Sequence, residues 1–189
     1  MRFNDTLRLK LNANSDVVNV EVLCVESVQV PSARTYHACC LVGKFMVICG
    51  GEAAASDLDD IWAFDLETQK WHKLENLDNF HAKRFHSASA VSGNRIVTFG
   101  GCHSEYVHLN DVNVFDLSDF VNSNGVNLRI TCEKLSFAKD AGLPSTRWGH
   151  TACVHHNLIY ILGGRNESDI SDLHTFDIDT RKWTEIDIS

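Results

Sequence analysis

A short apolar run that ends in two glycines occurs three times in this chain, and it constrains the fold more than any other feature. The three copies are KFMVICGG at residues 44–51, NRIVTFGG at residues 94–101 and NLIYILGG at residues 157–164. Each run has the length of a strand and is rich in β-branched or aromatic residues, so it predicts a strand that is buried on both faces. The paired glycines let the backbone bend tightly or approach another backbone closely. We therefore expect the chain to be built from one repeated β unit.

Other landmarks recur in step with the glycine pairs and divide each repeat into four expected strands. In the first repeat, an Arg-x-x-His sequence from Arg34 to His37 precedes the first strand, and the glycine run is the second. The third strand lies between Asp60 and Asp65, and Trp71 begins the fourth. The same landmarks recur in the third repeat at Arg147, His150, Asp172, Asp177 and Trp183. One such unit cannot bury both of its faces alone, so the pattern predicts a radial or stacked repeat protein.

The recurring residues suit structural roles. Asp65 and Asp177 begin expected turns, in which a carboxylate can accept backbone N–H bonds. Trp71 and Trp183 start the outer strands, where a large aromatic ring can fill the wedge between neighbouring sheets. The recurring arginines are expected to satisfy carbonyl groups or to pair with an aspartate of the neighbouring unit. These arginines are Arg34, Arg84 and Arg147.

The second repeat departs from the pattern in its last hairpin. Residues 118–127, SDFVNSNGVN, form an insertion, which we expect to be an exposed loop. After this insertion Cys132 takes the register that Trp71 has in the first repeat. The outer strand of the second repeat is therefore expected to lack its tryptophan.

Charge and composition narrow the classes of partner. The formal net charge of −8 at pH 7 argues against nucleic acid and against an anionic membrane surface. No apolar run reaches the length of a transmembrane helix, and the first residues lack the apolar core of a signal peptide. The seven cysteines are an odd count, and several lie in apolar strand patterns, which favours reduced thiols over a disulfide framework. We therefore expect a cytoplasmic protein.

With these motifs in place, the chain resembles the Kelch-repeat family of β-propellers. The resemblance rests on Arg-x-x-His, the apolar strand into Gly-Gly, the strand that ends in Phe-Asp, and the tryptophan six residues later. It implies an all-β fold in which each repeat forms one four-stranded blade around a central channel. The implied divisions are residues 33–80, 81–140 and 141–189 for three repeats, and residues 1–32 for the outer strands of a preceding blade, with strands at residues 6–11 and 17–30.

Three blades and a hairpin are fewer than a closed propeller contains, since propellers close with about four to eight blades. The expected fold is therefore a partial Kelch-type β-propeller that belongs to a six- or seven-bladed ring. A half-propeller alone would expose strand edges and apolar blade faces. Two explanations remain: the sequence is a fragment of a longer protein, or another chain, such as a second copy related by a two-fold axis, completes the ring.

The resemblance also implies a function, because Kelch propellers bind proteins or peptides through loops. These are the loops that follow Gly-Gly and the loops that lead into the innermost strand. Loops on a rigid scaffold are where binding residues concentrate, and Tyr, Trp and Arg are common anchors. The expected partner-binding residues are Tyr36, Glu52, Ser56, Phe85, His103, Ser104, Tyr106, Trp148, Arg165, Asn166 and Glu167. The predicted function is a protein-interaction module, a scaffold or a substrate-recruiting adaptor.

A metal or catalytic site is the competing hypothesis. Cys102, His103, Glu105 and His108 form the most notable group of metal-ligand residues, but no second group of this kind accompanies them. Galactose oxidase has Kelch-like blades and a copper site with a tyrosine cross-linked to a cysteine, yet no matching set of residues is visible here. We expect no catalytic residues, no metal and no cofactor. An enzyme with a site at the channel mouth, near His103 and Tyr106, and a structural half-propeller completed by another chain are kept as alternatives.

Overall fold

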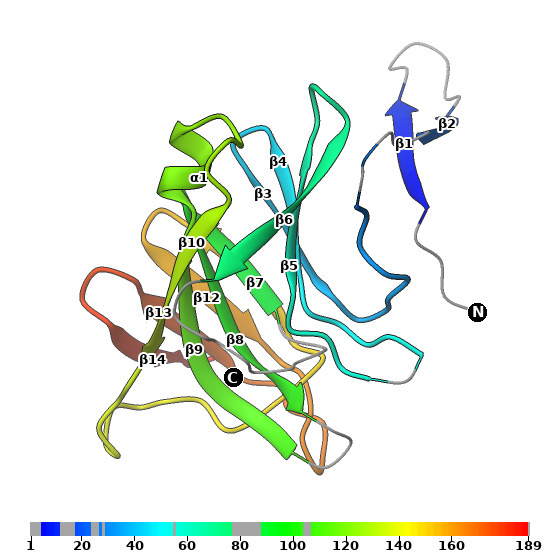
Figure 1. The fold of residues 1–189 in the computed structure, drawn as a ribbon. Coiled ribbons are helices and arrows are strands. Elements are labelled where there is room, and N and C mark those ends of the chain that lie inside the picture. The colour runs from blue at the N-terminus through cyan, green and yellow to red at the C-terminus, as the bar shows by residue number, and fades with distance from the viewer. Residues whose placement is uncertain are drawn as a thin grey trace.

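Fourteen strands and one short helix make up the described part of the molecule (Figure 1). This computed structural model describes residues 5–11, 18–23, 27, 29–54, 56–76, 88–103 and 107–188. The strands form a separate two-stranded hairpin and three four-stranded antiparallel blades. A short parallel pairing, in which Arg129 and Ile130 align with Glu75 and Asn76, joins the outer strands of the first two blades into one eight-stranded sheet. No helix in these residues has the length and apolar character needed to span a membrane.

Each blade is a simple meander of consecutive strands. The hairpin consists of β1 (Thr6–Leu11) and β2 (Val18–Leu23). Blade 1 consists of β3 (Ala38–Val42), β4 (Phe45–Cys49), β5 (Ile61–Asp65) and β6 (Lys70–Asn76). Blade 2 consists of β7 (Ala88–Ser92), β8 (Arg95–His103), β9 (Val107–Asp116) and β10 (Arg129–Leu135). Blade 3 consists of β11 (Thr151–His155), β12 (Leu158–Leu162), β13 (Leu173–Asp177) and β14 (Lys182–Ile186).

The three glycine-terminated runs are β4, β8 and β12, the second strands of their blades, as the sequence predicts. The first strands lie side by side, because β7 contacts both β3 and β11. The three blades therefore follow one another around a common inner edge, with the green blade 2 between the cyan blade 1 and the orange blade 3 in Figure 1. This is the arrangement of a Kelch-type β-propeller.

Two apolar cores fill the spaces between the blades. The core between blades 2 and 3 contains Trp183, whose ring lies 5.2 Å from that of Phe99 across the interface and 4.9 Å from that of Phe176. Trp183, at the start of the outer strand of blade 3, therefore fills the wedge between sheets, as expected for this residue. The core between blades 1 and 2 consists of Val42, Phe45, Val47, Ile61, Ala63, Leu74, Ile96, Phe115, Leu117, Phe120 and Ile130.

The insertion in the second repeat is not the exposed loop that the sequence suggested. Residues 118–122 form helix α1 (Ser118–Asn122), and Phe120 within it is 0% exposed. The Phe120 ring lies 4.4 Å from that of Phe45 in blade 1, and Cys132 packs against the same core. The expectation was wrong because it took non-repeating polar residues to mean a solvated loop. The insertion instead gives this interface an aromatic ring, in the repeat whose outer strand has cysteine in place of tryptophan.

The turns between third and fourth strands have the expected aspartate geometry. One Asp65 carboxylate oxygen accepts bonds from the N–H groups of Glu67 and Thr68, at 2.8 and 3.0 Å. In blade 3, Asp177 accepts equivalent bonds from Asp179 and Thr180, both at 2.9 Å. The repeated Phe-Asp motif therefore ends one strand and fixes the reversal into the next.

The N-terminal hairpin contains both strands expected there. The second covers Val18–Leu23; of the strand suggested over residues 17–30, residues 17, 24–26 and 28 lie outside the described part of the chain, and Ser27, Gln29 and Val30 are not in a strand. The hairpin touches blade 1 where the Trp71 indole N–H donates to the Thr6 hydroxyl at 3.4 Å. Its assignment to the outer part of a preceding blade stays a prediction.

Candidate functional site

The two classes of loop that the sequence singled out pair with each other in blades 1 and 3. Thr35 and Glu52 exchange backbone hydrogen bonds of 3.1 and 2.9 Å, and Trp148 and Arg165 exchange two of 2.9 Å. The second glycine of each pair permits this approach. A Cβ atom on Gly51 would lie 2.8 Å from the Thr35 carbonyl oxygen, which is too close for any side chain. Blades 1 and 3 therefore each present one joined surface at this end, which we call a corner.

The corner of blade 3 gathers an aromatic ring and basic side chains. The guanidinium carbon of Arg165 lies 5.3 Å from the centre of the Trp148 ring, a cation–π geometry. The His108 ring, from β9 of blade 2, lies 6.5 Å from the ring of Trp148 on the same side of the molecule. The Arg165 side chain is about half exposed, and its Nε lies 3.8 Å from the carboxylate of the exposed Asp169. The blade 3 corner, defined as Trp148, Arg165 and His108, can therefore offer an apolar face and a guanidinium group that is paired with Asp169.

Backbone bonds fix this corner to blade 2. The Arg147 carbonyl accepts a bond from the N–H of Gly101 at 2.8 Å, and the Arg147 N–H donates to the Leu109 carbonyl at 2.9 Å. A Cβ atom on Gly100 would lie 2.7 Å from the same Arg147 carbonyl oxygen, so glycine is required at this contact. The surface is therefore held by main-chain geometry that spans two blades.

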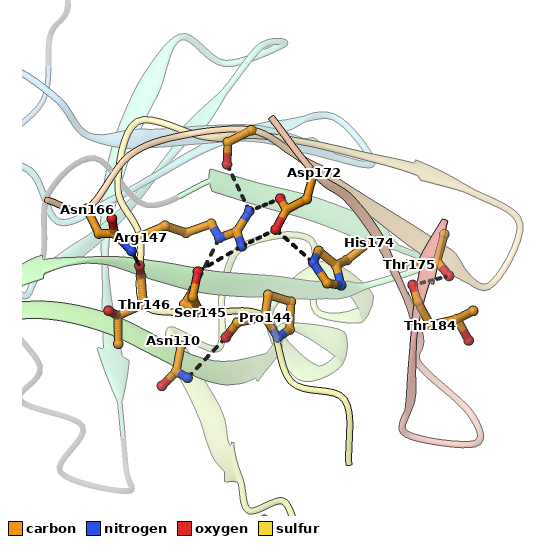
Figure 2. A network of polar contacts seen from close by, with 11 residues as sticks. Asn110, Pro144, Ser145, Thr146, Arg147, Asn166, Asp172, His174, Thr175 and Thr184 are labelled. Carbon is orange, nitrogen blue, oxygen red and sulfur yellow. Dashed lines mark hydrogen bonds and ion pairs between the residues drawn. The ribbon is translucent and has the colours of Figure 1, made fainter. Parts of the chain in front are cut away.

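A buried arginine network lies beneath the blade 3 corner (Figure 2). Arg147 is 0% exposed, and its guanidinium donates to the Gly163 carbonyl at 3.0 Å, the Ser145 carbonyl at 3.2 Å and both Asp172 carboxylate oxygens. The His174 ring nitrogen lies 3.0 Å from the same carboxylate. The Arg147 guanidinium bonded to Asp172 lowers the pKa of that carboxyl group from its ordinary value. The network therefore holds a charged pair beneath the loops that form the corner.

Blade 1 has the same network around Arg34. This guanidinium donates to the Gly50 carbonyl at 2.9 Å and to Asp60 at 2.6 and 3.0 Å. The carbonyl partners confirm the expected role of Arg34 and Arg147, whereas Arg84 lies outside the described residues. The expected aspartate of a neighbouring unit was wrong, because Asp60 and Asp172 belong to the same blade as their arginines. Each aspartate directly precedes the third strand, which lies next to the glycine-terminated second strand.

His150 is buried at the interface between blades 2 and 3. Its ring lies 5.3 Å from that of Phe99 in an edge-to-face arrangement. Burial, together with the nearby Arg147 charge, lowers the pKa of His150 to about 4. The imidazole is therefore neutral at neutral pH, so this recurring histidine packs between blades rather than acting as a surface charge.

The structure places most of the predicted binding residues at this end of the molecule. Tyr36, Ser56 and Glu167 are exposed, and Glu52 and Asn166 are half-buried. The Asn166 amide donates to the Thr146 carbonyl at 3.3 Å, so it also supports the loop. Three further predicted residues lie outside the described part of the chain: Phe85, Ser104 and Tyr106. The side chain of His103 also lies outside it.

Two details of this surface were not predicted from the sequence. Tyr36 and Trp148 do not occupy equivalent positions, because counting from Arg34 and Arg147 aligns Tyr36 with Gly149. His108 was considered only as a metal ligand, whereas the structure places it beside Trp148. The place of His108 in the alternating pattern of β9 can be read from the sequence. Its contact with Trp148 cannot, because that contact depends on how the blades are arranged in space.

Where the sequence suggested a loop directly after the second glycine pair, the strand continues to His103. β8 continues through Gly101 to pair Cys102 with His108 and His103 with Val107. Burial raises the pKa of the Cys102 thiol to about 11, with a smaller contribution from Asp57, so this thiol is protonated at neutral pH. Among the described side chains, no group of three His, Cys, Asp or Glu residues is arranged to hold a metal ion.

Two family profiles match the parts of the chain that contain the blades. The profile of the KLHDC2/KLHL20/DRC7 Kelch-repeats domain matches residues 1–124, and that of the Kelch motif matches residues 147–187. Because the first match covers more than half of the sequence, the chain belongs to the Kelch-repeat family. Domains of this family are generally protein-interaction modules and generally not enzymes.

Several curated proteins are similar over most of this chain. Kelch domain-containing protein 3 of Mus musculus is 29% identical over 172 residues, which cover 84% of this chain and 42% of the relative. Acyl-CoA-binding domain-containing protein 4 of Arabidopsis thaliana is 28% identical, with coverages of 82% and 22%. The leucine-zipper-like transcriptional regulator 1 homolog of Drosophila melanogaster is 26% identical, with coverages of 82% and 16%. The chain thus spans less than half the length of each of these relatives.

Proposed function

We propose that this chain is a protein-interaction module that works as a scaffold or as a substrate-recruiting adaptor. The observation that carries the proposal is the blade 3 corner, where an arginine lies over a tryptophan at an accessible surface. Tryptophan and arginine are among the residues that most often dominate binding energy at protein interfaces. The partner would be a protein or peptide that binds across the loops of neighbouring blades.

The way the corner is supported favours binding over catalysis. Buried arginine–aspartate pairs and inter-blade backbone bonds hold the loops, so little conformational freedom would be lost on association. The family is generally non-enzymatic, and the Cys102 thiol is protonated at neutral pH. Cys39, Cys49, Cys102 and Cys153 are free thiols, which supports a reducing, cytoplasmic location.

A peptide-selection experiment tests the proposed function. Random-sequence peptides displayed on phage would be selected against the protein, and synthetic copies of the selected peptides would be titrated by fluorescence anisotropy. Trp148→Ala and Arg165→Ala should each weaken binding about thirtyfold or more, because truncating an interface anchor costs about 2 kcal/mol or more. Arg181→Ala is the matched control, since this arginine is about as exposed as Arg165 and also pairs with a carboxylate, but its partner is Glu133 on outer strand β10, away from the corner.

The outcome separates specific binding from nonspecific attraction. Equal loss of affinity in the Arg165 and Arg181 variants would show that the peptides respond only to overall charge. Selected peptides whose affinity is unchanged by both corner substitutions would contradict the proposed binding surface.

A second candidate function is ring completion by another chain. In blade 3, Leu162 and Ile186 are exposed, whereas their counterparts in blade 1, Cys49 and Leu74, pack against blade 2. This face is therefore apolar at the same positions that form the interface between blades 1 and 2. Light scattering after gel filtration should then give a stable dimer near twice the chain mass of 21.2 kDa. A monomer at all concentrations would exclude completion by a second copy.

A further inference from the structure

The outer strand of blade 1 has an open edge for most of its length. β6 pairs with β5 over residues 70–74, but on its other side only Glu75 and Asn76 align with a strand, β10 of blade 2 (Figure 1). The chain that precedes β10 turns away from this edge, because the Asn127 N–H donates to the Ser123 hydroxyl at 2.8 Å. Among the described residues, no strand therefore lies beside residues 70–74 on this side of β6.

Hydrogen-bonding partners already hold both ends of this edge. The Trp71 N–H donates to the Ser27 hydroxyl at 2.8 Å, and the Glu75 N–H donates to the Leu128 carbonyl at 2.8 Å. Main-chain groups alternate in direction along a strand, so Lys73, two residues from each, directs its N–H and C=O to the same edge. No described residue bonds to these two groups. An unpaired strand edge of this kind is a template for pairing with another chain.

A groove of about 610 Å³ follows the same edge. The residues that line it are Ser27, Gln29, Lys70, Trp71, His72, Lys73, Leu74, Glu75 and Leu128. Leu74 is buried, and Trp71 and His72 are half-buried, so apolar surface flanks the main-chain groups. From Trp71 to Glu75 the edge is about 13 Å long, at about 3.3 Å per residue, which accommodates about four residues of an extended chain. The groove therefore suits an extended peptide better than a compact small molecule.

The charges along this edge indicate what kind of strand fits it. In the existing pairing, Arg129 of β10 aligns with Glu75, so residues of opposite charge face each other. Lys73, two residues earlier on the same face of β6, is exposed, and its Nζ lies 5.9 Å from the Trp62 ring. A second copy that paired with this edge about Lys73 would place two lysines opposite each other, which is unfavourable. A strand that continues the line of β10 would instead favour a carboxylate opposite Lys73.

We propose that the open edge of β6 binds an extended segment of a partner protein. The segment adds a strand beside Lys73, in line with β10, and places an aspartate or glutamate opposite that lysine. Its main-chain N–H and C=O groups pair with those of Lys73 and supply affinity, whereas the carboxylate supplies selectivity. This surface lies on the outer strand of blade 1, apart from the blade 3 corner, so the inference goes beyond the proposed function by adding a second binding site.

Peptides selected on the Trp148→Ala variant provide the probe, because this substitution weakens the competing corner. Random-sequence peptides would be displayed on phage, and the selected ones would be synthesised with one backbone N-methyl group at each position in turn. Methylation of residues that direct their N–H toward β6 should weaken binding about tenfold, whereas methylation of the alternate residues should have little effect. Fluorescence anisotropy would measure the affinities. The period of two would identify strand addition without any change to the protein.

A charge exchange tests the residue opposite Lys73. Lys73→Glu should weaken binding of these peptides about fivefold, and replacing the acidic residue of the peptide with lysine should restore it. Lys182→Glu is the matched control, because it makes the same charge change at an exposed lysine on outer strand β14 of blade 3, so affinity should stay unchanged. Amide hydrogen exchange at Lys73 should slow when peptide binds, while the amides of Trp71 and Glu75, which are already bonded, should change little.

The outcomes decide the proposal independently of the corner. If no selected peptide shows alternating effects of N-methylation, the edge of β6 is not a binding site and the proposal is wrong. If Lys182→Glu weakens binding as much as Lys73→Glu, the peptides respond to overall charge and the proposed register is wrong. Neither result bears on the proposed function, which is tested with Trp148 and Arg165.

Discussion

Replacing Arg147 with methionine is expected to lower the free energy of unfolding by about 3 kcal/mol, the lower end of the cost of removing one partner of a buried ion pair, because the Asp172 side chain is 26% exposed. Arg147 is 0% exposed, and methionine fills part of its volume but cannot donate to Asp172, Ser145 or Gly163. The substitution leaves the Asp172 carboxylate without its guanidinium partner. Urea denaturation followed by tryptophan fluorescence would measure the change.

Arg181→Met is the control, because it makes the same chemical change at an exposed arginine that pairs with Glu133. Exposed ion pairs contribute about 0–1 kcal/mol, so its effect should be small. Partner affinity, measured on the selected peptides under conditions in which the variant is folded, should change little. Loss of affinity without loss of stability would contradict the structural role of Arg147.

The pH dependence of unfolding gives a second readout of the same network. The pKa of Asp172 is lower in the folded protein than its ordinary value, mainly because Arg147 donates to the carboxylate. The pair therefore stabilises the fold fully above the unfolded-state pKa, and this contribution is lost as the pH falls through the folded-state pKa. The Arg147→Met variant should lose this part of the acid sensitivity of the wild type.

Much of the fold could be predicted because the same physical requirements recur in each repeat. Each blade needs a buried second strand, a tight turn between its third and fourth strands, and an apolar group that fills the space beside its neighbour. The apolar runs, the Phe-Asp turns and Trp183 meet these needs, so their spacing is visible in the sequence. Repetition also identified the arginines as structural. It did not identify their aspartate partners, although Asp60 and Asp172 recur too, because pairing within a blade depends on strands that are distant in sequence.

The candidate site was harder to predict, because its residues are the ones that differ between blades. Tyr36 and Trp148 were grouped by residue type, whereas the interval from the preceding arginine shows that Tyr36 matches Gly149. The contact between His108 and Trp148 joins different blades and has no periodic signal. The helix in the insertion was missed for the same reason, since its one buried aromatic residue belongs to no repeat.

Truncating Phe120, the buried aromatic residue of the insertion, is expected to have the other large effect on stability. Phe120→Ala should lower the free energy of unfolding by about 3–5 kcal/mol, the usual cost of truncating a fully buried phenylalanine. Its ring lies 4.4 Å from that of Phe45 and 5.9 Å from that of His72, both in blade 1, so the substitution leaves a cavity between blades 1 and 2. Denaturation in urea would measure the loss, and amide hydrogen exchange should show faster exchange in β4 and β10 than in blade 3.

Val126→Ala is the matched control, because it truncates an apolar residue of the same insertion that is 82% exposed. Its effect should stay within about 0.5 kcal/mol, as for most surface substitutions. A similar small effect for Phe120→Ala would mean that the insertion can leave the interface without cost, and that blades 1 and 2 are held by the other residues of their core. A large effect for Phe120→Ala alone would show that the second repeat has replaced the tryptophan of its outer strand with an aromatic residue from outside the repeat pattern.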